Sequence, residues 1–376
     1  MNFQFHMPVK FFSEQHAVEN HKEEFSRYGN RCLIVTGASS AKKSGALDDV
    51  TGVLTTAGIQ WKLFDEVGQN PLLSVCHRGG AVAAEFQADF IVGIGGGSPL
   101  DAAKAIAVFA ANPTLPAEDI YSSWEHPALP ILLVGTTAGT GSEVTKTSVL
   151  TIDRTGHKVS WGSEQSYAKA SFGDPRYTQS LPIGFTMSTG LDAVSHALEA
   201  YFSNTADSIS DMFAIESLKI LLPTLKTVWA TEGMPTMEQR TALYDASIYA
   251  GFALNRCGMV FCHLMGYYLS EEAGIPHGYA CAVFLPALID HSVPLAPHKA
   301  RRLFGELGIY AQELKDTIAM LTEADFTPIS DQKLEQLLEN WKGSKNIART
   351  LGTLDTAAQR KIAQRVLQKR FEGEKR

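Results

Sequence analysis

The chain has 376 residues, a length that favours two domains over a single hydrophobic core. Its 33 basic and 40 acidic residues give a net charge of −7 without a local basic stripe, so nucleic acid is disfavoured as a partner. No apolar run approaches the roughly 20 residues that span a bilayer, and the N-terminus lacks the apolar core of a secretory signal. We therefore expect a cytoplasmic protein with no membrane segment, whose five cysteines are reduced core thiols.

Short runs rich in Val and Ile alternate with helical patterns in the first half of the chain. Strands are predicted at residues 32–36, 90–94 and 131–134, with connecting helices at 44–57 and 71–85. Strands that alternate with helices in this way indicate βαβ units and a parallel sheet.

The pattern changes in the second half. Residues 151–160 predict a hairpin that turns at Gly156, and beyond Pro182 the apolar residues follow helical spacing almost to the C-terminus. The predicted fold class is α/β, with two domains. Residues 1–181 form a Rossmann-like, parallel-sheet, nucleotide-binding domain, and residues 182–376 form an all-helical metal-binding domain.

A glycine triplet follows the second predicted strand and precedes a helix. At Gly95, Gly96 and Gly97 a ligand can approach bare backbone amides, and the N-terminus of the helix favours an anion such as a pyrophosphate. Ser98 is expected to be the N-cap of this helix, and Asp101 to complete a capping box. The same residues would also suit an ordinary turn between a strand and a helix.

A second loop of similar character follows the third predicted strand. Residues 135–143 are dense in glycine and hydroxyl side chains. Two such loops at the ends of neighbouring parallel strands would face one crevice, where open α/β sheets bind their ligands. Together the loops predict a dinucleotide site, although the usual G-x-G-x-x-G fingerprint is absent after the first strand.

The turn after the first strand bears on the choice of cofactor. Gly37 stands where many nucleotide-binding folds carry an acid for the ribose hydroxyls, and it is followed by Ser39, Ser40, Lys42 and Lys43. Without a repelling carboxylate, and with hydroxyl and ammonium groups close by, a 2′-phosphate could be accommodated. We therefore expect NADP(H) in preference to NAD(H). The alternative is a polar surface turn whose lysines face water.

Four residues in the second half form a candidate metal site. Asp192 and His196 are four residues apart on a helical pattern, so both project from one face. His263 lies on another helical stretch, and His277 follows Pro276 at a turn. One carboxylate and three imidazoles suit Fe(II) or Zn(II). Taken singly, each histidine is more often a core or surface residue than a ligand.

These motifs, taken together, resemble the iron-containing (group III) alcohol dehydrogenase family. The resemblance runs from about residue 30 to residue 290. The matching segments occur in the family's order and comprise Gly95–Asp101, Thr136–Glu143, Asp174–Pro175, Gly190–Ala193, His196–Tyr201 and Pro276–Gly278.

The resemblance implies a fold, an activity and a set of site residues. The family pairs an α/β nucleotide-binding domain with a helical domain and has its active site in the cleft between them. Its metal ligands match Asp192, His196, His263 and His277. Its phosphate loop matches the glycine triplet with Ser98 and Asp101, and its nicotinamide-side loop matches Thr136, Thr137, Thr140 and Ser142. Members with glycine and serine at positions 37 to 40 tend to use NADP(H), and family likeness suggests a homodimer.

The chain departs from the family pattern at one position. Many members carry a further histidine four residues after the third ligand, where this chain has Tyr267. A phenol can relay a proton, but its ordinary pKa of about 10 suits that task less well than an imidazole. Tyr267 is thus a candidate catalytic residue in an atypical substrate pocket, or it simply packs the helix.

The implied reaction is hydride transfer between nicotinamide C4 and a small alcohol or aldehyde held as an alkoxide or carbonyl by a divalent cation. A same-fold oxidoreductase of a specialised polyhydroxy acid, such as one acting on the terminal hydroxyl of 3-deoxy-octulosonate, is an alternative suggested by Tyr267 and the stretch at Trp161. A nucleotide-binding sensor without turnover is another. A lyase of the dehydroquinate synthase type is disfavoured because it lacks the segment at 136–143 in this form.

Overall fold

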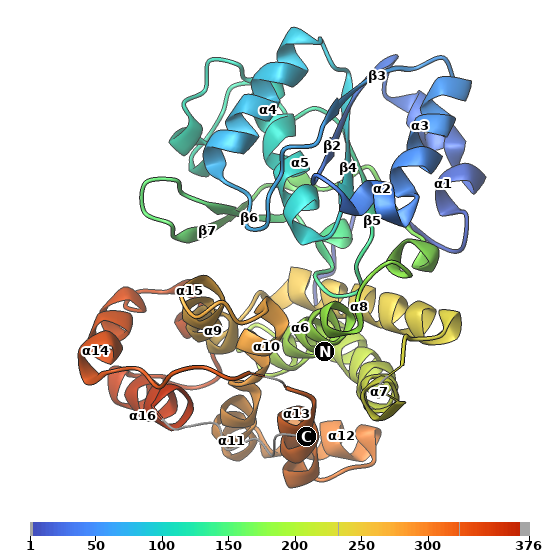
Figure 1. Cartoon of the computed structure of the whole chain (residues 1–376). Helices are drawn as coiled ribbons and strands as arrows, with labels where there is room; N and C mark the ends of the chain where they lie inside the picture. Colours follow the sequence, from blue (N-terminus) through green and yellow to red (C-terminus); the bar gives the residue numbers. More distant parts are fainter. Residues whose placement is uncertain (1–2, 232, 323, 369–376) are drawn as a thin grey trace. The chain divides into compact units, whose positions relative to one another are not determined.

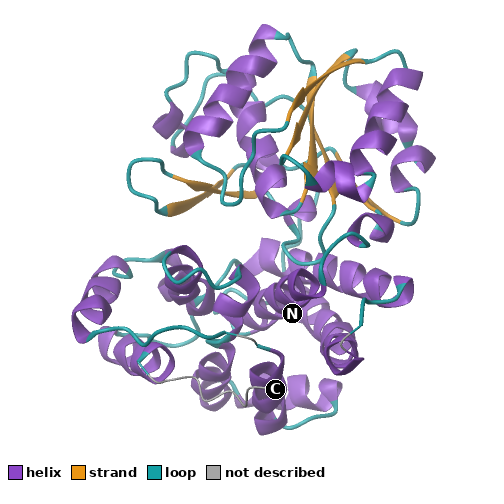
Figure 2. Ribbon diagram, in the orientation of Figure 1, coloured by secondary structure: helices purple, strands orange, loops and turns teal. Residues whose placement is uncertain are grey.

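The structure is a computed structural model that describes residues 3–231, 233–322 and 324–368. The chain forms two compact units (Figure 1). His6–Leu181 make up the α/β unit, and the chain from Pro182 onward makes up the helical unit. The described residues before His6 belong to the helical unit, where Phe5 packs on Phe213. Figure 2 shows the strands of the sheet in the α/β unit, and α-helices in both units.

The α/β unit contains a parallel six-stranded sheet with the order β1-β8-β5-β4-β2-β3. Its central strands are buried, apart from Arg31 at the start of β2, because runs of Val, Ile and Leu present apolar side chains to both faces. The strands are β1 (Lys10–Ser13), β2 (Arg31–Thr36), β3 (Gln60–Phe64), β4 (Phe90–Gly95), β5 (Ile131–Gly135) and β8 (Ala170–Gly173).

Helices cover both faces of this sheet. Leu33, Ile91 and Leu133 of the central strands face one core cluster, which also contains residues of α4 (Leu73–Glu85) and α5 (Gly97–Ala111). The intervening side chains on the same strands point to the opposite face of the sheet and belong to a second core cluster. This cluster also contains residues of α1 (Ala17–Asn20), α2 (Ser40–Ser44) and α3 (Ala46–Thr56). The predicted parallel sheet with connecting helices is therefore present. The helix predicted at residues 44–57 is divided between the end of α2 and α3.

The strand order reverses direction at one point in the sheet. From β2 the chain continues outward to β3, whereas from β4 it continues to the other side, to β5. The loops after β2 and β4 therefore flank a topological switch point, where open α/β sheets bind ligands. The predicted hairpin is also present, as β6 (Thr147–Thr151) and β7 (Lys158–Gly162), with Gly156 at φ 69° in its turn.

The helical unit is built around α6, which is buried along most of its length. Helices α7, α8 and α10 pack directly against it. The helices of the described chain in this unit are α6 (Ile183–Tyr201), α7 (Ser208–Thr231), α8 (Met237–Cys257), α9 (Phe261–Glu271), α10 (His277–Ala282), α11 (Leu285–Leu295), α12 (Pro297–Leu307), α13 (Ala311–Leu321), α14 (Asp331–Asn340), α15 (Lys345–Arg349) and α16 (Thr356–Leu367).

One stretch of the described chain is long and apolar enough to cross a membrane, in contrast to the expectation from the sequence. It covers His277–Leu295, with a mean hydropathy of 1.3. Asp290 and His291 interrupt its apolar run in the sequence. Because 67% of the stretch is buried inside the protein, it has the character of a core helix.

Candidate functional site

Two of the four predicted metal ligands lie on α6. Asp192 and His196 stand one turn apart, and only 6% of each side chain is exposed. The helix is buried along most of its length, so it carries these two polar side chains into the core of the helical unit. This placement agrees with the four-residue spacing noted in the sequence.

The other two predicted ligands reach the same place because α10 lies against α6 and α9. A Cβ atom on Gly278 would lie 1.7 Å from the carbonyl oxygen of Ser188 on α6. A Cβ atom on Gly266 of α9 would lie 2.7 Å from the carbonyl oxygen of Ala280. These contacts exclude any side chain, so both positions require glycine. The close approach places His277 and His263 beside α6.

One carboxylate oxygen is surrounded by the three imidazoles. Asp192 Oδ1 is 3.7 Å from His196 Nε2 and 3.3 Å from His263 Nε2. The same oxygen is 3.8 Å from His277 Nε2. The His263 side chain is 1% exposed, whereas that of His277 is 33% exposed, so the cluster is open on the side of His277. The structure thus brings together all four residues.

A fifth polar residue, Glu199, orients one of the imidazoles. It is fully buried on α6, and its carboxylate accepts hydrogen bonds from His263 Nδ1 and, at 2.8 Å, from the backbone N–H of Val260. With Nδ1 donating to Glu199, His263 Nε2 is directed at Asp192. Glu199 was not predicted, although its spacing of seven residues from Asp192 and three from His196 already places it on their face of the helix.

The charges of this cluster call for a cation. Burial by itself would raise the pKa of Asp192, but the imidazoles of His196, His263 and His277 outweigh it and lower the pKa below its usual value. Burial disfavours the charged form of His263, yet Cys281, Glu199 and Asp192 raise its pKa well above the usual value. Two buried carboxylates thus attract positive charge into the cluster, and a divalent cation would supply it in place of protons on the imidazoles. The donor set fits such a cation.

Two further side chains border the cluster. The Tyr267 ring stacks on His277 with ring centroids 5.9 Å apart, and burial raises the pKa of its phenol, so the group stays protonated at neutral pH. The Cys281 thiol lies 3.8 Å from His277 Nε2 and was not predicted as part of the site. Its position one turn after His277 on α10 is the sequence signal that could have identified it.

In the α/β unit, the two predicted loops lie side by side at the carboxyl ends of β4 and β5. Gly95 pairs with Gly135, and the Thr136 N–H donates to the Gly95 carbonyl at 2.9 Å. Gly95 has φ +152°, and a Cβ atom there would lie 2.6 Å from Pro99 Cγ. The strand can therefore turn into α5 only with glycine at this position.

The rest of the glycine triplet is packed against the second loop. A Cβ atom on Gly96 would lie 3.0 Å from Thr137 Cγ2, and one on Gly97 would lie 2.8 Å from Thr140 Cγ2. Both glycines and both threonines remain partly exposed. Bare backbone and threonine hydroxyls at the N-terminus of α5 form a cradle that suits a phosphate group.

The predicted capping of α5 was wrong. The helix begins at Gly97 with the extended Gly96 at its N-cap and no side-chain cap, so Ser98 already lies inside the first turn. Ser98 instead accepts a hydrogen bond from the Asn70 N–H at 3.2 Å. Asp101 completes no capping box. It accepts from Ser142 Oγ at 2.6 Å and from the backbone N–H of Val149 at 2.8 Å.

A buried lysine completes this internal network. Lys104 is 0% exposed, and its ammonium group donates to Ser142 Oγ at 2.8 Å and to the Thr147 carbonyl at 2.7 Å. Burial lowers the pKa of Lys104 and raises that of Asp101, although the two opposite charges partly offset these shifts. The side chains of Asp101 and Ser142 therefore fasten the second loop to α5.

The turn after β2 is more exposed. Gly37 is half-buried, and a Cβ atom there would lie 3.1 Å from the Val67 carbonyl. Ser39, Ser40 and the two lysines that follow are exposed at the start of α2. The Lys42 ammonium pairs with Asp65 Oδ2 at 3.6 Å, so a carboxylate does lie near this turn.

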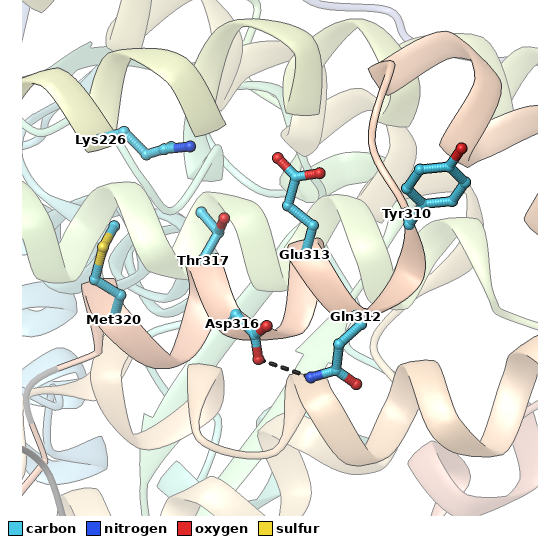
Figure 3. A pocket seen from close by; sticks show the side chains of 7 residues that line it. All are labelled: Lys226, Tyr310, Gln312, Glu313, Asp316, Thr317 and Met320. Atoms are coloured by element: carbon cyan, nitrogen blue, oxygen red, sulfur yellow. Dashed lines mark hydrogen bonds between the residues drawn. The ribbon is translucent and has the colours of Figure 1, made fainter.

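A separate pocket of about 580 Å³ lies in the helical unit (Figure 3). Its wall includes Lys226 of α7 and several residues of α13. Most of its lining residues carry a polar group, although the surface that they present to the pocket is mostly apolar, and Gln312 donates to Asp316 at 2.7 Å. The lining residues are Lys226, Tyr310, Gln312, Glu313, Asp316, Thr317 and Met320. None of them belongs to the predicted site.

Comparisons with known proteins cover nearly the whole chain. The family model described as iron-containing alcohol dehydrogenase matches residues 8–175, and that described as the C-terminal part of the Fe-containing alcohol dehydrogenase family matches residues 186–372. The chain is 34% identical to 1,3-propanediol dehydrogenase of Klebsiella pneumoniae over 277 residues, which is 72% of this chain and 70% of that protein.

Two butanol dehydrogenases are also similar. The NADPH-dependent butanol dehydrogenase of Clostridium saccharobutylicum is 28% identical, over 78% of this chain and 77% of that protein. The solved structure of the NADH-dependent butanol dehydrogenase A of Thermotoga maritima superimposes with a TM-score of 0.83 at 27% identity, over 98% of this chain and 99% of that one. These findings do not favour a polyhydroxy-acid oxidoreductase or a sensor without turnover.

Proposed function

This chain belongs to the iron-containing alcohol dehydrogenase family and is an NAD(P)-linked oxidoreductase acting on CH–OH groups, and from that premise we propose how it works. It interconverts small alcohols and aldehydes with a divalent cation held by Asp192, His196, His263 and His277. One observation carries the proposal: three imidazole nitrogens lie within 3.8 Å of a single buried carboxylate oxygen.

Each residue of the site has its own proposed role in binding the cation, the substrate or the cofactor. When bound, the cation acts as a Lewis acid on the alcohol or carbonyl oxygen. Asp192 and the three neutral imidazoles hold it, and Glu199 keeps His263 Nε2 directed toward it. Tyr267, with its raised pKa, remains a phenol that can donate a hydrogen bond to a substrate oxygen. The glycine triplet binds the cofactor's pyrophosphate, and the hydroxyls of Thr137 and Thr140, which the family resemblance assigns to the nicotinamide side, border the same cradle.

Removal of one imidazole tests the proposal directly. His263→Ala should lose both the bound metal, measured by elemental analysis, and alcohol-dependent reduction of the nicotinamide. The matched control is His298→Ala, because His298 is an exposed histidine on α12 of the same unit and should keep both. Reconstitution of metal-depleted protein with Fe(II) or Zn(II) then identifies the ion that restores turnover. Full activity of metal-free protein would overturn the mechanism.

The cofactor preference proposed is NADP(H). The support is the absence of an acid at Gly37 and the exposed hydroxyls and ammonium groups of Ser39, Ser40, Lys42 and Lys43, although Asp65 offsets part of the Lys42 charge. Ser39→Asp should lower kcat/KM for NADPH by about tenfold or more, because it places like charge near the 2′-phosphate. The activity with NADH serves as the internal control, and an equal loss with both cofactors would contradict the proposal.

Two further expectations remain as proposals. A cytoplasmic location is supported by the five cysteines, all of them buried and free of disulfides. A homodimer is proposed from the likeness to the family, and sedimentation of the purified protein would test it.

A further inference from the structure

The structure places a thiol inside the candidate metal cluster. Cys281 is fully buried on α10, one turn after His277. The donor atoms of Asp192, His263, His277 and Cys281 all lie within 4.8 Å of one another. The Cys281 Sγ atom is 3.8 Å from His277 Nε2. The thiol thus shares the cluster with three of the four proposed ligands.

We propose that Cys281 is a further ligand of the cation, an inference that rests on the metal site of the proposed function. Thiolate is the softest donor in this cluster, and it favours zinc or cobalt over iron(II) and magnesium. Coordination replaces the S–H bond with a bond from sulfur to the metal, and the proton leaves to solvent. The thiolate would also neutralise the positive charge that Asp192 leaves on a divalent ion.

Burial alone does not distinguish Cys281 from the other cysteines of the helical unit. Cys257 is 2% exposed and Cys262 is 0% exposed, so both are as buried as Cys281. Cys262 even adjoins His263 in the sequence. Neither belongs to the set of donor atoms within 4.8 Å of one another. Cys257, at the end of α8, therefore offers a matched control for removal of a buried thiol.

The absorption spectrum of metal-depleted protein loaded with cobalt(II) shows whether a thiolate binds the metal. The wild-type protein should show visible d–d bands, which report cobalt at the site, and a near-ultraviolet thiolate-to-cobalt charge-transfer band. Cys281→Ala should lose the charge-transfer band and keep the d–d bands, whereas Cys257→Ala should keep both. Cys281→Ala should also lose more affinity for zinc than for iron(II), measured by competition with a chelator.

The outcomes separate this inference from the function on which it rests. If the wild type shows the visible bands but no charge-transfer band, Cys281 is not a ligand and the metal site still stands. The same conclusion follows if the charge-transfer band persists in Cys281→Ala. Failure of the wild type to bind cobalt would overturn the metal site itself. If Cys281→Ala does not fold, X-ray absorption of the zinc-loaded wild type decides. One sulfur neighbour supports the inference, and none refutes it.

Discussion

Glu199 determines which nitrogen His263 presents to the metal cluster. Its buried carboxylate accepts from Nδ1, which leaves Nε2 directed at the site, where a bound cation would take the electron pair of this nitrogen. Glu199→Gln replaces this carboxylate with an amide that can also donate, and the imidazole is then free to adopt the other tautomer. We expect metal affinity to fall by about 10- to 100-fold. Chelator competition followed by elemental analysis measures the change.

An exposed glutamate provides the comparison for this prediction. Glu238→Gln, at the start of α8 in the same unit, removes the same charge from the surface and should leave metal affinity unchanged. Equal metal affinity in Glu199→Gln and the wild type would show that the tautomer of His263 is set by another group.

Residue spacing alone predicts only part of the candidate metal cluster. The separation of Asp192 and His196 is local, so helical geometry predicted that they share a face. His263 and His277 come from other helices, so residue type alone made them candidates, and the family resemblance gave the reason to group them with Asp192 and His196. Cys281 was missed because five cysteines without a CxxC pair indicated only core thiols. Contact between separate helices depends on packing, such as the approach at Gly278, that spacing does not encode.

Among elements, the junction of α5 with the loop after β5 determines the shape of the predicted phosphate cradle. Gly97→Ala would place a Cβ atom 2.8 Å from Thr140 Cγ2 and force the two loops apart. Such overpacking costs about 1–3 kcal/mol. We expect the dissociation constant for NADPH, measured by fluorescence titration, to rise by about tenfold or more.

A second glycine-to-alanine change isolates that effect from helix propensity. Gly52 is exposed within α3, and a Cβ atom there meets nothing within 4 Å. Gly52→Ala should stabilise the protein by roughly 0.5–1 kcal/mol and leave NADPH binding unchanged. If Gly97→Ala bound NADPH as tightly as Gly52→Ala, the cradle would have to lie elsewhere.

The elements that the sequence predicted are those with the strongest apolar patterns. Strands β2, β4 and β5 are buried on both faces, so their continuous apolar runs were recognised. Strand β3, Gln60–Phe64, is mostly exposed at the edge of the sheet and carries polar residues. The outer strand β1 and its neighbour β8 have only four residues each. Their pairing is a tertiary effect that short segments do not signal.

At the scale of the whole molecule, the two units have separate cores and carry different parts of the chemistry. The predicted phosphate cradle belongs to the α/β unit, and the candidate metal cluster belongs to the helical unit. A ligand that binds only the folded state stabilises the part that it binds, by about 2.7 kcal/mol at one hundred times its dissociation constant. The proposed function therefore predicts that each ligand protects a different unit.

Amide hydrogen exchange with mass spectrometry can resolve this prediction along the chain. Zinc added to metal-depleted protein should slow exchange in α6, α9 and α10, because these helices carry the proposed ligands and open only when the ligands separate. NADPH should slow exchange at the start of α5 and in the residues after β5. Slower exchange in α6 on addition of a chelator would contradict the assignment of ligands to units. Unchanged exchange in both cradle loops on addition of NADPH would contradict it as well.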